Sequence, residues 1–218
     1  MKRKQERFKL IEEYPHVIEP SKTCYMAMKG KWHSEFFKNQ NPITLELACG
    51  RGEYTIGLSK IFPQCNFVGV DIKGERLWKG STIALEEALT NVGFLRTHIL
   101  LIHNFFEPGE VNDIWLTFPD PRPRKRDIKR RLTSPRYLDI YKELLYRNGT
   151  VRLKTDNTQL FEYTLEQLQL RSDVVDLVFT ADVYLSELKK ECFEIKTRYE
   201  QEFTQKGEKI KYLRFRFA

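Results

Sequence analysis

The order of apolar and polar positions along the chain predicts strands that alternate with helices. Five short apolar runs indicate buried strands, over 42–48, 66–71, 97–103, 111–118 and 150–155. Segments with apolar residues at helical spacing lie between or after them, over 53–62, 76–92, 135–147 and 157–170. This alternation is typical of an α/β fold with an open, doubly wound, mostly parallel sheet and helices on both faces. Such sheets bind ligands at the carboxyl ends of their strands.

Local signals indicate where some of these elements begin and end. Ser134-Pro135 predicts a helix start, with the serine as N-cap and the proline at the first helical position. Asn148-Gly149 predicts the end of that helix. Over 209–218, apolar and basic residues alternate, which predicts an outer strand of the sheet.

Composition favours one folded domain with an anionic partner. Of 218 residues, 41% are hydrophobic, enough for a large core, and the net charge is +7. We expect a basic N-terminal arm over 1–31, free to move, and a single domain over 32–218. The arm lacks the apolar segment of a signal peptide, and no run is long enough to span a membrane. The four cysteines lack ligand spacing, so we predict free thiols, no metal and a cytoplasmic protein.

Acids and glycines near the ends of the first two predicted strands indicate a nucleotide-like ligand. Gly50 and Gly52 follow the first strand, and Asp71 ends the second at a spacing that suits an acid on ribose hydroxyls. Thr55 stands where a dinucleotide fingerprint has a third glycine, which favours S-adenosylmethionine over a pyrophosphate ligand. Glu46 would face the ammonium end of its methionine moiety. An ordinary strand-to-helix turn is the alternative.

Two further strand ends carry polar residues. Asn104, after the run 97–103, is placed to hydrogen-bond the adenine edge, although it could equally be a loop asparagine. Asp120 follows the fourth strand, between two prolines, and eight positive charges follow it within 122–136. A turn aspartate in a solvated loop is the alternative, but so dense a run of one sign repels itself without an anion such as nucleic-acid phosphate.

Asp156 and the segment 197–200 are weaker candidates for a substrate site. Asp156 follows the fifth strand, where an N-cap is the plainer interpretation. Thr197 to Glu200 could also be the start of a surface helix.

The motifs LELACGRGEY, FVGVD, WLTFPDP, KRR, LKTDN and TRYE, in that order, resemble the bacterial tRNA (guanine-N7)-methyltransferase family. The resemblance covers roughly residues 32 to 217 and implies a class I methyltransferase, Rossmann-like fold with a seven-stranded sheet. It also implies S-adenosylmethionine as cofactor, tRNA as partner, and methylation of a guanine in the variable loop.

The resemblance assigns roles residue by residue. Positions implied to contact the cofactor are Glu46, Gly50, Gly52, Asp71, Asn104 and Asp120, with Asp120 also catalytic. Positions implied to contact substrate are Arg124, Arg126, Lys129, Arg130, Arg131, Asp156, Thr197, Arg198, Tyr199 and Glu200. The chain departs from the family at Arg122-Pro123-Arg124, where Trp-His-Lys is common, and at Asn104, where an aspartate is frequent.

Other functions stay open on sequence. One is methyl transfer to a different RNA atom, such as an exocyclic amine, and another is a catalytically silent RNA-binding protein. A nicotinamide dehydrogenase is disfavoured by Thr55. The sequence makes no prediction of oligomeric state.

Overall fold

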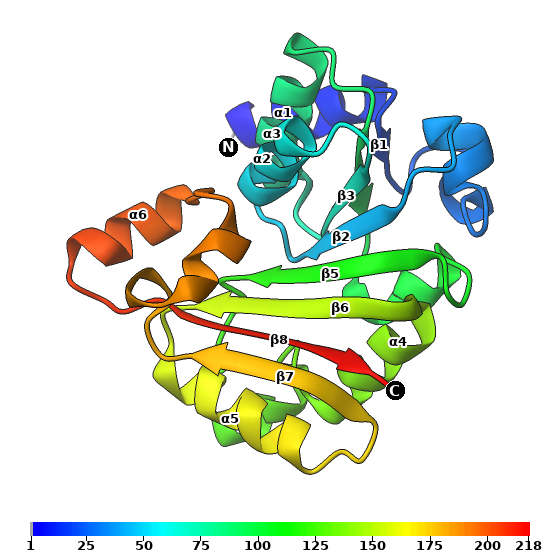
Figure 1. Cartoon of the computed structure of the whole chain (residues 1–218). Coiled ribbons are helices and arrows are strands. Elements are labelled where there is room, and N and C mark those ends of the chain that lie inside the picture. The colour runs from blue at the N-terminus through cyan, green and yellow to red at the C-terminus, as the bar shows by residue number, and fades with distance from the viewer. Residues whose placement is uncertain (1) are drawn as a thin grey trace.

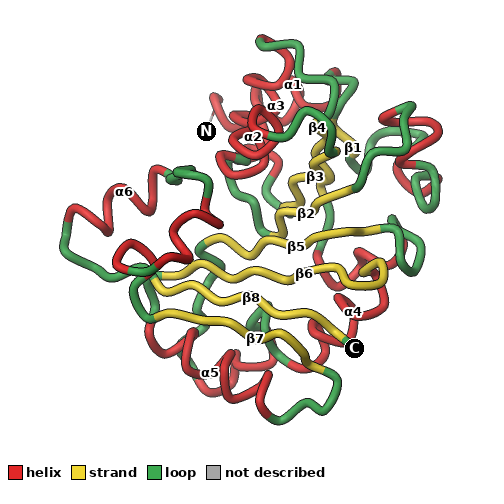
Figure 2. Tube along the Cα trace, in the orientation of Figure 1, coloured by secondary structure: helices red, strands yellow, loops and turns green. Residues whose placement is uncertain are grey.

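The computed structural model describes residues 2–218, which form one eight-stranded sheet with helices on both faces (Figures 1 and 2). The strands are β1 (Val17–Ile18), β2 (Ile43–Leu47), β3 (Asn66–Asp71), β4 (Val92–Arg96), β5 (Val111–Thr117), β6 (Leu145–Thr155), β7 (Val174–Thr180) and β8 (Lys211–Phe217). The α-helices are α1 (Lys2–Glu13), α2 (Glu53–Ile61), α3 (Gly74–Glu86), α4 (Pro135–Leu144), α5 (Thr158–Gln169) and α6 (Arg198–Gln205). The predicted α/β fold is confirmed, and the strand beyond the expected seven is the two-residue β1.

The strand order β1-β4-β3-β2-β5-β6-β8-β7 contains the reversal of a doubly wound sheet. From β2 the chain moves outward through β3 and β4, then returns to place β5 on the other side of β2. Strands β1 to β6 are parallel, and β8 is antiparallel to both β6 and β7. The crevice between β2 and β5 is therefore the place where such a sheet binds ligands.

Apolar side chains alternate between the two faces of the central strands. Val68, Val70 and Leu95 belong to the core that includes residues of α4 and α5, whereas Val92 and Phe94 pack with residues of α1, α2 and α3. Figure 1 shows α1, α2 and α3 gathered at one end of the sheet and α4 and α5 at the other. Because both faces are covered, the central strands are mostly apolar, and the polar residues within them, such as Glu46, are buried.

The strand predicted over 97–103 is wrong, because β4 ends at Arg96 and the following residues form a 3₁₀-helix, η3 (Ile99–Asn104). Ile102 and Phe105, the residue that caps η3, are buried, and Ile99 is half-buried, whereas Leu101 is exposed; positions 99, 102 and 105 recur every three residues, which matches three residues per turn. The helix predicted over 76–92 correspondingly ends early, at Glu86, so that the chain is extended again by Val92.

Two other element predictions are wrong. Helix α4 ends at Leu144, and Asn148, with φ 70°, lies within β6, opposite an irregular pairing with β5. Strand β8 lies between β6 and β7 rather than at the edge. Its alternation arises because one face packs Leu213 and Phe215 into the core while Arg214 on the other pairs with Glu191.

The segment 2–31 packs against the β4 end of the sheet. Strand β1 pairs with β4, and Ile11 and Phe8 of α1 lie so close to Gly74 of α3 that a Cβ there would be 2.7 Å from each. Among residues 2–218, no helix is long and apolar enough to cross a membrane. Within the same residues, no three His, Cys, Asp or Glu side chains group as metal ligands would.

Candidate active site

Two cavities open at the carboxyl ends of β2, β3, β4 and β5, and both are lined by Ala48, the residue after β2. The smaller, of about 430 Å³, is lined by Asp71, Ile72, Thr97, His98, Ile99, Leu100, Asp120, Arg122, Arg130, Leu132, Arg136 and Tyr137. The larger, of about 710 Å³, extends from the turn after β2 to α3, to Thr117 and Phe118, and to residues 197–199. The hollow at the strand ends therefore consists of two neighbouring cavities that share the wall residue Ala48.

The turn after β2 requires glycine for two different reasons. Gly50 and Gly52 have φ of 57° and 69°, in the left-handed region that favours glycine. At Gly52 an added Cβ would also lie 2.6 Å from the ring of Phe94, whereas at Gly50 it would meet nothing within 4 Å. Packing thus fixes Gly52, while Gly50 lines the larger cavity with its backbone.

Glu46 lies beneath this turn and lines neither cavity. It is 2% exposed, and its carboxylate accepts hydrogen bonds from the Thr55 amide at 2.8 Å and from the Thr55 and Thr117 hydroxyls. Burial raises its pKa to about 7, although these hydrogen bonds act in the opposite direction. Glu46 therefore connects β2, α2 and β5, and it accounts for a threonine at the position of the third glycine.

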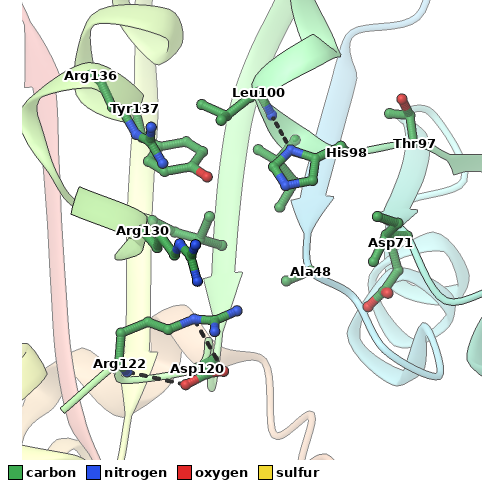
Figure 3. Close-up of a pocket in the computed structure, with 13 residues that line it drawn as sticks. Ala48, Asp71, Thr97, His98, Leu100, Asp120, Arg122, Arg130, Arg136 and Tyr137 are labelled. Carbon is green, nitrogen blue, oxygen red and sulfur yellow. Dashed lines mark hydrogen bonds and ion pairs between the residues drawn. The ribbon is translucent and has the colours of Figure 1, made fainter. Parts of the chain in front are cut away.

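Asp71 is at the wall of the smaller cavity (Figure 3). Its carboxylate is held by two backbone amides, those of Gly50 at 3.0 Å and Lys73 at 2.8 Å, one on each oxygen. Each oxygen keeps further acceptor capacity. The carboxylate is thus fixed in orientation and able to accept more hydrogen bonds.

His98, not Asn104, occupies the wall after β4. Thr97 to Leu100 line the smaller cavity, whereas Asn104 is at the far end of η3 and lines neither cavity. His98 caps η3, because its Nδ1 accepts the Leu100 amide at 3.2 Å. In the neutral ring the proton is therefore on Nε2. The sequence reasoning missed His98 because it placed the end of this strand several residues too late.

Asp120 is in the loop after β5, among arginines (Figure 3). Its side chain is 60% exposed, and its two oxygens contact the Arg122 amide at 3.1 Å and the Arg122 Nε at 3.2 Å. Phe118 and Arg122, on either side of the Pro-Asp-Pro segment, have φ of 48° and 47°. Figure 3 shows Arg122 and Arg130 across the cavity from Asp71.

The basic run predicted to contact RNA divides into exposed and buried residues. Arg124, Arg126, Lys129 and Arg130 are exposed on or beside the 3₁₀-helix η4 (Lys125–Arg130). Arg131 is only 3% exposed, and its guanidinium donates to the backbone carbonyls of Pro121 and Arg122. The structure therefore does not place Arg131 on the surface that RNA could reach.

The segment 197–200 is likewise divided. Thr197, Arg198 and Tyr199 line the larger cavity, and the Tyr199 ring, 45% exposed, stacks on Phe203 with a centroid distance of 4.2 Å. The Tyr199 hydroxyl is 3.4 Å from Asp156 Oδ2, which brings two predicted substrate residues together.

Glu200 faces the interior instead. It is fully buried, with its carboxylate 2.7 Å from Lys154 Nζ and hydrogen-bonded to the Tyr184 hydroxyl. Its amide is capped by Thr197 Oγ1 at 3.0 Å. In this arrangement Glu200 fixes the start of α6 against β6 and does not present its carboxylate to the cavity.

Fold and cavities together define a class I methyltransferase. Residues 40–213 match the model of a family described as putative methyltransferases. The chain belongs to the tRNA (guanine-N(7)-)-methyltransferase family, since it is 49% identical to such a protein of Cytophaga hutchinsonii, over 99% of this chain and 98% of that one. It is also 47% identical to one of Bacteroides fragilis, over 98% of this chain and 85% of that one.

Solved structures show the same fold at low sequence identity. The 16S rRNA methyltransferase KamB superposes with a TM-score of 0.63 at 12% identity, over 85% of this chain and 92% of its own. A 16S rRNA (adenine(1408)-N(1))-methyltransferase of Catenulisporales acidiphilia, solved with its cosubstrate SAM, gives 0.54 at 12% identity, over 87% and 90%. These similarities support the class I fold and do not identify the substrate.

Proposed function

We propose that this protein transfers the methyl group of S-adenosylmethionine to N7 of a guanine in the variable loop of tRNA. The observation that carries the proposal is the pair of cavities that share Ala48, beside an exposed run of basic side chains. The family of the chain agrees with this substrate. A tRNA substrate also implies that the protein works in the cytoplasm.

The smaller cavity fits the adenosine part of the cofactor. Asp71 would accept hydrogen bonds from the ribose hydroxyls. Ile72, an apolar side chain left 54% exposed at the wall, would be covered by the adenine ring. His98 Nε2–H would donate to a ring nitrogen of adenine, the role predicted for Asn104. When bound, S-adenosylmethionine supplies an electrophilic methyl group on a sulfonium.

The turn Ala48 to Gly50 would hold the methionine part where the cavities meet. Its backbone follows β2 directly and is fixed by the Gly50 amide on Asp71. We assign Glu46 to supporting this turn through Thr55 and Thr117 rather than to contacting the ligand.

The larger cavity would receive the target guanine, which must leave its stacked position to reach the methyl group. Tyr199 offers a ring face, and Asp156, in contact with the Tyr199 hydroxyl beside the cavity, offers a carboxylate that can accept hydrogen bonds from the Watson–Crick edge of guanine. Arg124, Arg126, Lys129 and Arg130 would hold phosphates, which position the RNA without reading its sequence.

The chemistry requires alignment more than proton transfer. Guanine N7 has an available lone pair, so no general base is needed, and proximity and orientation supply most of the acceleration. Positive charge passes from sulfur to the base during transfer, and the Asp120 carboxylate would stabilise it throughout.

The proposal is tested by incubating the protein with unfractionated bacterial tRNA and methyl-labelled S-adenosylmethionine, then identifying the labelled nucleoside by mass spectrometry. We expect 7-methylguanosine. Label in another nucleoside, or none with correctly folded protein, would overturn the proposal.

A further inference from the structure

Arg131 differs from every other basic residue of its run. Of the eight arginines and lysines between Arg122 and Arg136, all of which the structure describes, Arg131 is the only one that is buried. A buried guanidinium requires partners, because an unpaired charge in the interior is costly. These partners indicate its role.

The Arg131 guanidinium connects three parts of the chain. Its Nε donates to the Pro121 carbonyl at 3.0 Å, and its Nη2 donates to the Arg122 carbonyl at 3.3 Å. Its Cζ lies 4.4 Å from the ring centre of Tyr163, on α5, in a cation–π contact. Its own amide bonds to Ile128 and its carbonyl to the Ser134 amide, at the junction of η4 and α4.

The segment that Arg131 holds is the loop of Asp120. Arg122 has a positive φ, which is unfavourable for an arginine and persists only where the surroundings impose it. Arg122 in turn contacts Asp120 through its amide and its side chain. A continuous series of contacts therefore runs from Tyr163 through Arg131 and Arg122 to the Asp120 carboxylate.

We propose that Arg131 is a positioning residue: it fixes the Asp120 loop and joins it rigidly to the exposed RNA-binding face of η4. This inference rests on the proposed function of Asp120. It assigns Arg131 a role inside the protein in place of the contact with RNA that the resemblance implied. Arginine suits this role because its planar fork reaches two carbonyls while its face stacks on a ring. Lysine supplies the same charge without the fork or the stacking surface.

Arg131→Lys separates the two roles, because it keeps the charge. The positioning role predicts a single-turnover methyl-transfer rate, at saturating tRNA and cofactor, at least about 10-fold below wild type. It also predicts an unchanged salt dependence of tRNA binding for Arg131→Met. A phosphate contact predicts a nearly normal rate for Arg131→Lys and a salt slope lowered by about 1 for Arg131→Met.

Two variants on α5 provide a matched comparison that leaves Arg131 in place. Tyr163→Phe keeps the ring and should transfer methyl groups at the wild-type rate, whereas Tyr163→Leu removes the ring and should be several-fold slower. Equal rates for both Tyr163 variants, together with a wild-type rate for Arg131→Lys, would overturn the proposal.

Amide hydrogen exchange of the segment 118–124 distinguishes this inference from the proposed function. Arg131→Lys should accelerate exchange there, since the Arg122 amide would lose its fixed acceptor on Asp120, whether or not tRNA is the substrate. Unchanged exchange would overturn the positioning role. If exchange of this segment is faster in Arg131→Lys but the wild-type protein methylates no tRNA, the proposed function is overturned and the positioning role of Arg131 stands.

Discussion

Asp120 keeps an exposed carboxylate among guanidinium groups, so its charge contributes to the site more than to the fold. Asp120→Asn keeps the shape and the acceptor for the Arg122 amide while removing the charge. We expect methyl transfer to fall by roughly 10²-fold or more, as for the loss of a preorganised electrostatic group. Thermal unfolding should change little, because the side chain is mostly solvent-exposed.

A single-turnover assay and circular dichroism melting on the same Asp120→Asn protein check both expectations. If Asp120 were an ordinary turn residue, the variant would melt earlier and still transfer methyl groups at the wild-type rate.

Glu46 is expected to make stability depend on pH. Its pKa is about 7 in the folded protein against an ordinary 4.5, so between these values the folded state binds a proton that the unfolded state does not. The contribution of Glu46 to the free energy of unfolding is therefore greatest below about pH 4.5. It decreases as pH rises to about 7, by up to about 3 kcal/mol in total.

Glu46→Gln removes the titration while keeping a hydrogen-bonding side chain. Urea unfolding at pH 5, 6, 7 and 8 should show the free energy of unfolding of wild type falling relative to that of the variant up to pH 7, then remaining level. A difference that stays constant from pH 5 to 8 would mean that the carboxylate is ionised throughout.

For single residues, the sequence was enough to predict polar side chains at strand ends, but it did not show which charged side chains are buried. Asp71 and Asp120 could be placed because a parallel sheet brings its carboxyl ends together. The positions of Arg131 and Glu200 could not be predicted, because burial of a charge depends on distant partners. Lys154 is 46 residues from Glu200, and Tyr163, the cation–π partner of Arg131, is on α5, beyond α4 and β6 in the chain.

At the scale of elements, η4 is a short helix whose exposed basic residues form one side of the site. Replacing Lys129 and Arg130 by alanine should weaken tRNA binding and lower its salt slope by about 2, if each contacts one phosphate. Because Arg130 also lines the smaller cavity, calorimetric titration with S-adenosylhomocysteine shows whether the double replacement affects cofactor binding as well.

The control for this pair is Lys189→Ala with Lys190→Ala, on the exposed 3₁₀-helix η6 (Glu187–Cys192). These residues carry the same charge and line neither cavity. The control should leave the salt slope of tRNA binding unchanged. If the salt slope fell equally in both double variants, binding would respond only to the net charge of the protein.

Most elements of the sheet could be predicted, because central strands buried on both faces leave mostly apolar segments, as at residues 67–70 of β3 and 114–116 of β5. The run 97–103 could not be assigned correctly, since a 3₁₀-helix with one buried side produces an equally apolar stretch. The same error put the candidate for the adenine contact at Asn104, which lines neither cavity, whereas His98 is at the wall of the smaller one.

At the scale of the whole molecule, the fold places a ligand-sized hollow at the reversal of strand order and surrounds it with segments far apart in sequence. The turn after β2, the loop after β5 and the start of α6 all reach the larger cavity. Segment 2–31 also contributes to this hollow, since Arg7 of α1 stacks over Trp78 of α3 at its wall.

Methyl transfer within this hollow should reach N7 of guanine in tRNA and no other atom. The most direct test uses one tRNA transcribed twice, once with guanosine and once with 7-deazaguanosine, in which a C–H group replaces N7. With labelled S-adenosylmethionine, we expect 7-methylguanosine in the first transcript and no label in the second. Equal labelling of both transcripts, or a methyl group on any other atom, would contradict it.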